Sequence, residues 1–290
     1  MTAIVTSDLP EPSLLWRCGD AIRRNPMIAV GGVLLVTLLT MAVLAPWIAS
    51  DPFRLAPINR LRPPSERWWF GTDRYGRDVF SLTVYGARVS LIVGISVALI
   101  SSAIGLAIGL ACGYFRWVDG IVMRIMDGLM AIPSILLAIA LITLTRPGLG
   151  IVIIAIVIPE VPRIARVVRS VVLSIRSEPY VESAIAGGTR SAKLLVRHIL
   201  PNTMAPLIVQ ATYVCASAML IEAGLSFLGA GVPPEIPSWG NIIAQGRTFF
   251  QIAPWSILIP GAFLAVTVLA VNMLGDGLRD RLDPRLARRM

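Results

Sequence analysis

Long apolar runs separated by polar stretches dominate this chain and predict a protein built from membrane-crossing helices. A helix needs about 20 predominantly apolar residues to cross the hydrocarbon core of a bilayer. The first run, residues 27–50, carries no charge and is too long for a cleaved signal, so we expect a retained span. The same criterion predicts about six spans, at residues 27–50, 89–114, 126–145, 149–175, 203–229 and 255–274.

The polar stretches set the expected organisation. They divide the chain into an N-terminal segment, a transmembrane domain and a tail, at residues 1–26, 27–275 and 276–290. Two polar loops interrupt the transmembrane domain, at residues 51–88 and 177–201. The predicted fold class is therefore an all-α integral membrane protein.

Glycine and proline positions predict how the spans pack. Gly105, Gly109 and Gly113 recur every four residues, so they share one helix face that another helix can approach closely. Pro133 predicts a kink in the third span, and Pro159 predicts a bend in the fourth.

The loop at residues 177–201 has the pattern of a helix-turn-helix. Pro179 suits the first turn of a helix, and Gly187 and Gly188 can end that helix because glycine accepts a left-handed backbone. We expect Thr189 to cap a second helix and Pro201 to limit it. A solvated connection between two spans would be equally polar, so this pattern alone leaves its function open.

The end of the 51–88 loop is turn-rich and then amphipathic. The apolar side chains of Val79, Phe80 and Leu82 are expected to lie on the bilayer surface, while the charged side faces water.

Composition supports a membrane protein. The chain is 56% hydrophobic and 15% charged, with a mean hydropathy of +0.75, whereas soluble domains are about 45–50% apolar and about 25% charged. The formal net charge is +9. Because the positive residues flank apolar runs, cytoplasmic flanking charge and anionic lipid explain this balance better than nucleic acid.

Positive residues also predict orientation, since cytoplasmic loops carry an excess of Lys and Arg. Arg23 and Arg24 precede the first span, and with both termini cytoplasmic 17 of the 26 Lys and Arg residues lie inside. Seven arginines of residues 51–88 then lie outside, against the rule, but inverting the chain would move 17 positive charges outside. A strip of arginines is expected at the inner end of the fourth span, at Arg163, Arg166 and Arg169.

Candidate chemistry within the chain is sparse. The three cysteines are dispersed, and the one histidine, His198, cannot build a metal site with them. The nearest approach to a phosphate-binding loop runs from Gly187 to Lys193, but it lacks the glycine before lysine and the Ser or Thr after it. We therefore expect no ATP site, metal site or catalytic centre in this chain.

Residues of the 177–201 loop, taken in order, match a known pattern. Glu182-Ser183-Ala184, Gly188 and Leu200-Pro201 resemble the EAA loop of permease subunits of ABC importers, with Ser183 in place of the usual alanine. In that family the loop docks into a groove of an ATPase subunit and transmits ATP-driven closure to the membrane helices. The resemblance implies a set of coupling residues: Glu182, Ala184, Gly188, Arg190, Lys193, Arg197, Leu200 and Pro201.

Three further segments, residues 71–91, 222–241 and 275–286, are similar to permeases for oligopeptides, dipeptides and nickel. Leu82 departs from the arginine common in that group. The first segment implies an outer-loop signature of Asp73, Gly76, Arg77, Asp78 and Tyr85. The second implies residues of an outer gate or substrate pathway, namely Glu222, Ser226 and Trp239.

These resemblances together imply the ABC importer permease fold and a multi-pass subunit in the cytoplasmic membrane of a prokaryote. Such a subunit forms a pathway with a second homologous permease and receives substrate from an extracytoplasmic binding protein. ATP and Mg²⁺ are bound by two ATPase subunits, or one fused ATPase, and this chain itself holds no cofactor. Contact with membrane lipid is expected, and none with nucleic acid.

Oligopeptides or dipeptides are the expected substrates. A nickel complex is the alternative, although the chain offers no cysteine or histidine cluster for such a metal. A secondary transporter is a weaker match, because we see no inverted repeat, and the acids near membrane depth, Glu160 and Glu222, are placed near span ends. A membrane enzyme would need a cluster of polar catalytic groups, which the pattern does not show.

Overall fold

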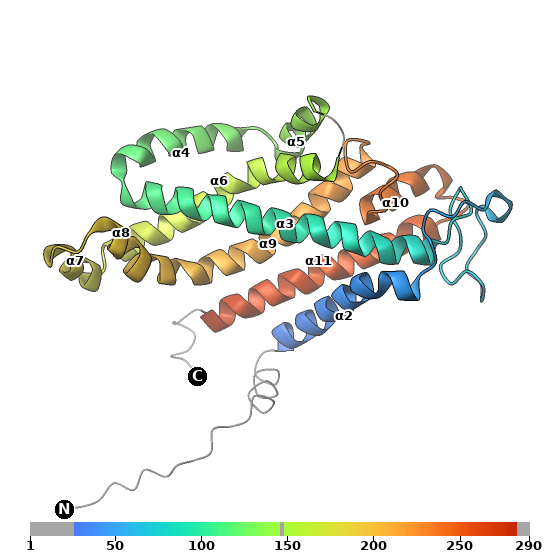
Figure 1. Cartoon of the computed structure of the whole chain (residues 1–290), viewed down its shortest axis with the longest axis horizontal. Coiled ribbons are helices and arrows are strands. Elements are labelled where there is room, and N and C mark those ends of the chain that lie inside the picture. The colour runs from blue at the N-terminus through green and yellow to red at the C-terminus, as the bar shows by residue number, and fades with distance from the viewer. Residues whose placement is uncertain (1–25, 146–147, 283–290) are drawn as a thin grey trace, which may run out of the picture.

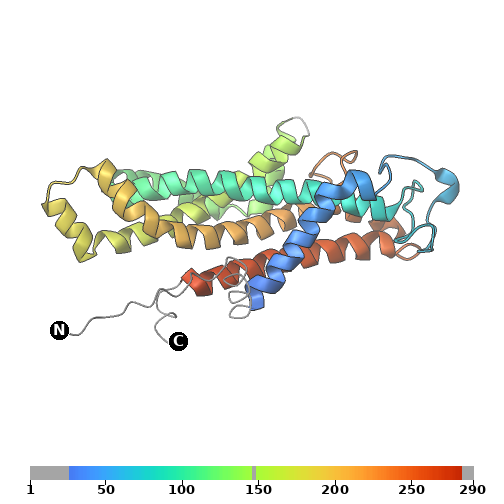
Figure 2. The same cartoon turned by 60° about the horizontal axis from the view of Figure 1, so that its bottom comes forward.

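Long helices lie side by side along one axis in the computed structural model, which describes residues 26–145 and 148–282 (Figure 1). These helices are α3 (Val79–Tyr114), α6 (Leu149–Arg176), α9 (Leu200–Phe227) and α11 (Trp255–Leu282), and a further long helix is α2 (Pro26–Ile48). α2 packs obliquely across α11 (Figure 2). In the described part of the chain there is no β-strand, and one isolated bridge pairs Thr72 with Asp78.

Shorter elements complete the two ends of the molecule. The short α-helices are α4 (Arg116–Ala131), α5 (Ser134–Thr143), α7 (Pro179–Ala186), α8 (Ser191–Leu194) and α10 (Trp239–Gly246). Single 3-10 turns lie at η1 (Pro57–Asn59) and η3 (Arg247–Phe249), and a π-helical segment, η2 (Leu195–Ile199), joins α8 to α9. α7 and α8 lie at one end of the molecule, and residues 51–78 and α10 lie at the other (Figure 1).

The glycine face of α3 packs directly on α6. A Cβ atom added to α3 would lie 2.6 Å from a side-chain carbon of α6 at each of three pairs: Gly105 with Ile164, Gly109 with Val168, and Gly113 with Val172. Such a distance is well inside van der Waals contact, so glycine is required at all three positions. The close helix approach predicted from the four-residue spacing is confirmed.

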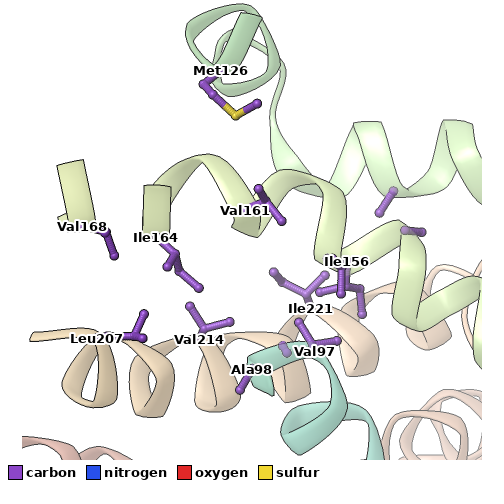
Figure 3. Packing of buried hydrophobic residues seen from close by; sticks show 14 of the residues in the cluster. Val97, Ala98, Met126, Ile156, Val161, Ile164, Val168, Leu207, Val214 and Ile221 are labelled. Carbon is purple, nitrogen blue, oxygen red and sulfur yellow. The ribbon is translucent and has the colours of Figure 1, made fainter. Parts of the chain in front are cut away.

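The main apolar core fills the space between α3, α6 and α9 (Figure 3). Val97 of α3 and Ile164 of α6 are fully buried there, and Val214 and Ile221 of α9 face them. Lipid tails are as apolar as these side chains, so close packing rather than exclusion of water holds the helices together.

The second long helix differs from the prediction at its start. α3 begins at Val79, where the Asp78 carboxylate accepts hydrogen bonds from the backbone N–H groups of Phe80 and Ser81 at 3.3 and 3.0 Å. Val79 and Leu82 are buried within the protein, so the predicted surface helix on the bilayer is wrong. Residues from α10 cover this turn of α3, and the local sequence pattern cannot show that contact.

The third predicted span is a bent pair of helices. α4 and α5 meet at an angle of 89°, and Pro133 stands at the N-cap of α5. The predicted kink at Pro133 is therefore a complete break. α4 begins at Arg116, well before the predicted start at residue 126.

The arginines of α6 are paired with acidic residues. Three ion pairs follow along the helix, namely Arg163 with Glu160, Arg166 with Asp127 and Arg169 with Asp119. The last two reach α4 and hold it against α6. The predicted strip of arginines lies along α6, and each arginine meets a carboxylate that lies one turn away or far from it in sequence. Its placement at the inner end of the span stays a prediction.

Four helical segments are long and apolar enough to cross a membrane, counted over the described residues, and the α4–α5 pair adds a fifth if it is one span. α6 fails this criterion because it carries charged residues from Glu160 onward. α11 continues to Leu282, into the predicted tail. The six-span count and the cytoplasmic termini stay predictions, and residues 1–25, with Arg23 and Arg24, and 283–290 lie outside the described residues.

Candidate functional site

The 177–201 loop folds into two short helices at one end of the molecule (Figure 1). α7 starts with Pro179 in its first turn. It ends in a Schellman motif, in which the N–H groups of Gly188 and Thr189 donate to the carbonyls of Ile185 and Ala184 at 3.0 and 3.1 Å. Gly188 has φ +76°, and a Cβ there would meet nothing within 4 Å. The backbone conformation, and not a lack of space, therefore requires glycine at this position.

The second helix of the loop differs from the prediction in two respects. Its N-cap residue is Arg190, which makes no capping hydrogen bond, so the predicted cap at Thr189 is wrong because that residue closes α7. Pro201 does not end the helix, since residues 191–227 form one helical path. η2 changes the hydrogen-bonding register just before Pro201, which lies in the first turn of α9, where a missing N–H is tolerated.

Buried contacts fix the loop to the bundle. Three of its own side chains, Val181, Leu194 and Ile199, are fully buried and belong to the main apolar core. The Tyr114 hydroxyl at the end of α3 donates to Ser191 Oγ at 3.0 Å. The loop is therefore held in a defined position against the ends of the long helices.

The opposite side of the loop is exposed and charged. Four of the predicted coupling residues have exposed side chains that make no ion pair with any described residue: Glu182, Arg190, Lys193 and Arg197. Of the others, Ala184 and Leu200 are half-buried, and Gly188 and Pro201 are exposed. Large apolar side chains are exposed beside them, at Tyr180, Ile185 and Val196. An ordered surface that mixes apolar groups with unpaired charges is suited to docking a protein partner.

A buried carboxylate marks the other end of the molecule. Glu222 of α9 is fully buried, and its Oε1 accepts hydrogen bonds from Ser226 Oγ and Ser238 Oγ, both at 2.8 Å. Ser238 is the N-cap residue of α10, so this cluster joins α9 to α10. We call Glu222, Ser226 and Ser238 the Glu222 latch.

Trp239 anchors α10 from inside the core. Its side chain is fully buried, with Nε1 donating to the carbonyl of Thr83 at 2.9 Å and the backbone N–H donating to Ser90 Oγ at 3.2 Å. Both acceptors belong to α3. Trp239 is thus a packing and hydrogen-bonding group in this structure, whereas the resemblance placed it in a gate or pathway.

The outer-loop signature is hydrogen-bonded to α10 as well. Two backbone N–H groups and the Arg77 side chain all bond to Asp73, and Arg77 Nη2 also donates to Gln245 Oε1 of α10 at 2.7 Å. Gly76 has φ +74°, and a Cβ there would lie 1.8 Å from the Ala56 carbonyl oxygen. Asp73, Gly76 and Arg77 therefore build the loop itself.

The predicted residues form two separate groups, at opposite ends of the bundle. Glu222, Ser226, Trp239, Asp73 and Arg77 meet around α10, Asp78 caps α3 nearby, and Tyr85 lies half-buried on α3. Sequence reasoning missed Gln245 and Thr83, which carry no local signal of their partners. Ser238 does carry a local signal, because a serine just before an apolar helical turn is a favoured N-cap residue. Within the described residues, no group of three His, Cys, Asp or Glu could hold a metal ion.

Two protein-family models match most of the chain. Residues 103–288 match the model of binding-protein-dependent transport system inner membrane components. Residues 13–64 match the model of the N-terminal TM domain of oligopeptide transport permease C.

Individual relatives match over nearly their whole length. A probable peptide ABC transporter permease of Sinorhizobium fredii is 58% identical over 92% of each chain. A dipeptide transport system permease of Alkalihalophilus pseudofirmus is 43% identical over 91% of this chain and 88% of its own. An oligopeptide transport system permease of Bacillus subtilis is 38% identical, with 94% and 90% covered.

A solved structure shares the fold. The inward-facing methionine ABC transporter MetNI superposes with a TM-score of 0.54 over 70% of this chain and 97% of that chain, at 21% identity. That likeness concerns the fold alone, but it agrees with the family matches. This chain belongs to the family of inner membrane components of binding-protein-dependent ABC transport systems, and it is a multi-pass protein of the prokaryotic inner membrane.

Proposed function

We propose that this chain is the permease subunit of an ATP-driven peptide importer and that its 177–201 loop docks on an ATPase subunit. The observation that carries this proposal is the loop itself, a fixed helix-turn-helix that exposes four unpaired charges. Its partners are a second homologous permease, two ATPase subunits or one fused ATPase, and an extracytoplasmic binding protein. The ATPases bind ATP and Mg²⁺.

Docking on a cytoplasmic ATPase places the 177–201 loop on the cytoplasmic side. Both termini are then cytoplasmic, and residues 51–78 and α10 face outward. Six spans follow if the α4–α5 pair and α6 each cross the membrane. The ion pairs between α6 and α4 support such a placement of α6, because a charge in the membrane is tolerated when it is paired.

α9 supplies a mechanical connection between the two ends. One helical path runs from Ser191 in the loop to Phe227, and Glu222 lies near its far end. A displacement of α7 and α8 by the ATPase therefore moves the N-terminal part of this path. The Glu222 latch passes that displacement to α10, so a cytoplasmic event changes the outer face.

Relatives favour peptides as the substrate. The proteins named above are described as permeases for peptides, dipeptides or oligopeptides. A peptide is held through backbone groups and termini, so we expect uptake of short peptides of mixed sequence. The nickel alternative has no comparable support.

Reconstitution of the full complex in liposomes tests the substrate. We expect ATP-dependent uptake of labelled di-, tri- or pentapeptides that requires the binding protein. A complex with a hydrolysis-deficient ATPase is the matched control and should show no uptake. Nickel uptake with a chelating carrier, which peptides neither accompany nor compete with, would overturn the substrate assignment and leave the permease assignment standing.

A further inference from the structure

The arginines of the first outer segment need an explanation. Residues 51–78, which we call the arginine loop, hold six arginines and four acidic residues. In the proposed orientation this loop lies outside, where the positive-inside rule disfavours positive charge. Orientation therefore does not account for these arginines, and another role must.

Three of the six arginines make contacts within the loop, and for Arg67 the contact is with the Trp68 ring, 5.5 Å from its centroid. Arg77 bonds to Asp73 and to Gln245, and the guanidinium of Arg74 lies over the Tyr75 ring, 4.5 Å from its centroid. The other three are exposed and form no ion pair with any residue that the structure describes: Arg54, Arg60 and Arg62.

The loop presents these arginines on an ordered scaffold. Backbone hydrogen bonds join its two arms, from Leu61 N–H to the Asp73 carbonyl and from Thr72 N–H to the Arg62 carbonyl, both at 3.0 Å. Trp255 Nε1 of α11 donates to the Thr72 carbonyl at 3.1 Å. Because the backbone is already ordered, little conformational entropy is lost when a partner binds.

Large apolar side chains are exposed among the arginines. Ile58 is 86%, Trp69 67% and Leu55 64% exposed. Arginine and tryptophan are among the residues that dominate the binding energy of protein interfaces, and the apolar groups beside them exclude water from such contacts. The arginine loop also extends past the ends of α3 and α11 in both views (Figures 1 and 2). That position favours a partner in the aqueous space beyond the bilayer over a lipid headgroup.

We propose that the arginine loop is a docking surface for an acidic protein surface on the outer side of the membrane. Resting on the proposed function, we assign that surface to the binding protein, with carboxylates opposite Arg54, Arg60 and Arg62. Guanidinium groups pair with carboxylates in a bidentate geometry, which gives both attraction and register. The apolar groups at Ile58 and Trp69 pack in the same interface.

The loop is connected to the moving parts of the permease. Arg77 reaches Gln245 of α10, and α10 is joined to α9 through the Glu222 latch. A partner that displaces the arginine loop therefore also displaces α10. α10 is the element that connects the outer face to α9 and, through α9, to the 177–201 loop.

Charge reversal in the assembled complex tests the docking surface. The triple variant Arg54→Glu, Arg60→Glu and Arg62→Glu is compared with the same positions changed to lysine, in nanodiscs of neutral lipid. The glutamate variant should raise the binding-protein concentration for half-maximal ATPase stimulation by about tenfold or more, and the lysine variant by about threefold at most. Basal ATPase activity without binding protein should match the wild type in both. The wild-type affinity should fall with salt more steeply than that of the glutamate variant.

The outcomes separate this proposal from the proposed function. Unchanged stimulation of an assembled glutamate variant would overturn the docking surface and leave the importer assignment intact. A wild-type complex that no loaded binding protein stimulates would count against the importer assignment itself. An effect of charge reversal that appears only in anionic vesicles would assign the arginines to lipid headgroups and overturn the proposal. The single variant Arg60→Glu is measured in parallel in case the triple variant fails to assemble, with a smaller shift in the same direction expected.

Discussion

The 177–201 loop and the Glu222 latch stand at opposite ends of the same helical path and treat their polar groups in opposite ways. In the loop, Glu182, Lys193 and Arg197 are exposed and have no ionic partner among the described residues. In the latch, the Glu222 carboxylate is fully buried and receives two serine hydroxyls.

The difference separates two kinds of function. Leaving a charged side chain exposed to water costs little free energy, and the group stays available to a partner. The absence of an internal ion pair therefore points to a role in docking. A buried polar group is costly unless it is hydrogen-bonded, so the role of Glu222 is visible as the contacts it makes. The loop is suited to docking, and the latch is suited to holding α10 on α9.

Orientation is the sharpest test of this comparison. Single cysteines at Ser65 and Thr248, both exposed at the α10 end, are compared with one at Ala192 in the loop, in a background without the three native cysteines. On intact cells an impermeant maleimide should label the first two almost completely and Ala192 only after permeabilisation. If only the cysteine at position 192 were labelled on intact cells, the chain would have the opposite orientation.

Removal of the latch carboxylate should have the largest effect on stability. Glu222→Leu leaves two buried hydroxyls without their acceptor, at a cost of about 1–3 kcal/mol for each. We expect a lower thermal unfolding temperature of the purified complex and loss of transport, with Glu222→Gln much closer to wild type because its amide oxygen still accepts.

Glu178→Leu, at an exposed glutamate, is the matched control and should change stability by no more than about 0.5 kcal/mol. A Glu222→Leu complex as stable as the wild type would show that the latch is not an internal tie.

Strain in the loop should affect coupling more than stability. Gly188→Val places a β-branched residue at φ +76°, which costs about 1–2 kcal/mol locally. Membrane insertion should be normal, while transport and stimulation of the ATPase by loaded binding protein are lost. Gly187→Ala is the control, because Gly187 has φ −73° and accepts a side chain. Wild-type coupling in Gly188→Val would reject the loop as the ATPase dock.

Truncation of exposed loop charges should leave stability least changed. Glu182→Ala and Lys193→Ala each remove an unpaired, solvated group, so the unfolding free energy should move by about 0.5 kcal/mol or less. Binding-protein-stimulated ATPase activity should nonetheless fall, because the ATPase subunit loses a charged contact. Full stimulation in the double variant would restrict the dock to the apolar surface of the loop.

Features decided within a few neighbouring residues were predictable. Pro179 and Gly188 bound α7 because proline suits a first turn and only glycine accepts the left-handed stop without strain. The spacing of Gly105, Gly109 and Gly113 reports a close helix contact because a helix repeats every 3.6 residues. In both cases the signal is local, namely the helical repeat or the backbone conformation, although the structure alone shows that α6 is the helix packed on the glycines.

Features that depend on distant partners were not predictable in the same way. The arginines of α6 match the pattern of a positive inner end, yet Arg166 and Arg169 meet Asp127 and Asp119 from α4. Pro201 matches the pattern of a helix end, yet the helical path continues through it. The π-helical segment η2 precedes Pro201, which lies in the first turn of α9, where a missing N–H is tolerated. The partner in each case is an element whose position follows from packing.

From the sequence alone, the apolar runs determined that this is a helical membrane protein, and ordered motifs at the loop and outer segments determined its family resemblance. Both rest on short-range rules, namely the length a helix needs to cross lipid and the backbone that glycine and proline allow. Tertiary structure alone decided that Glu222 bonds to Ser238, that Trp239 is buried against α3, and that Arg77 reaches α10. Those contacts join residues separated by loops, and buried hydrogen-bonding partners become defined only once the helices have packed.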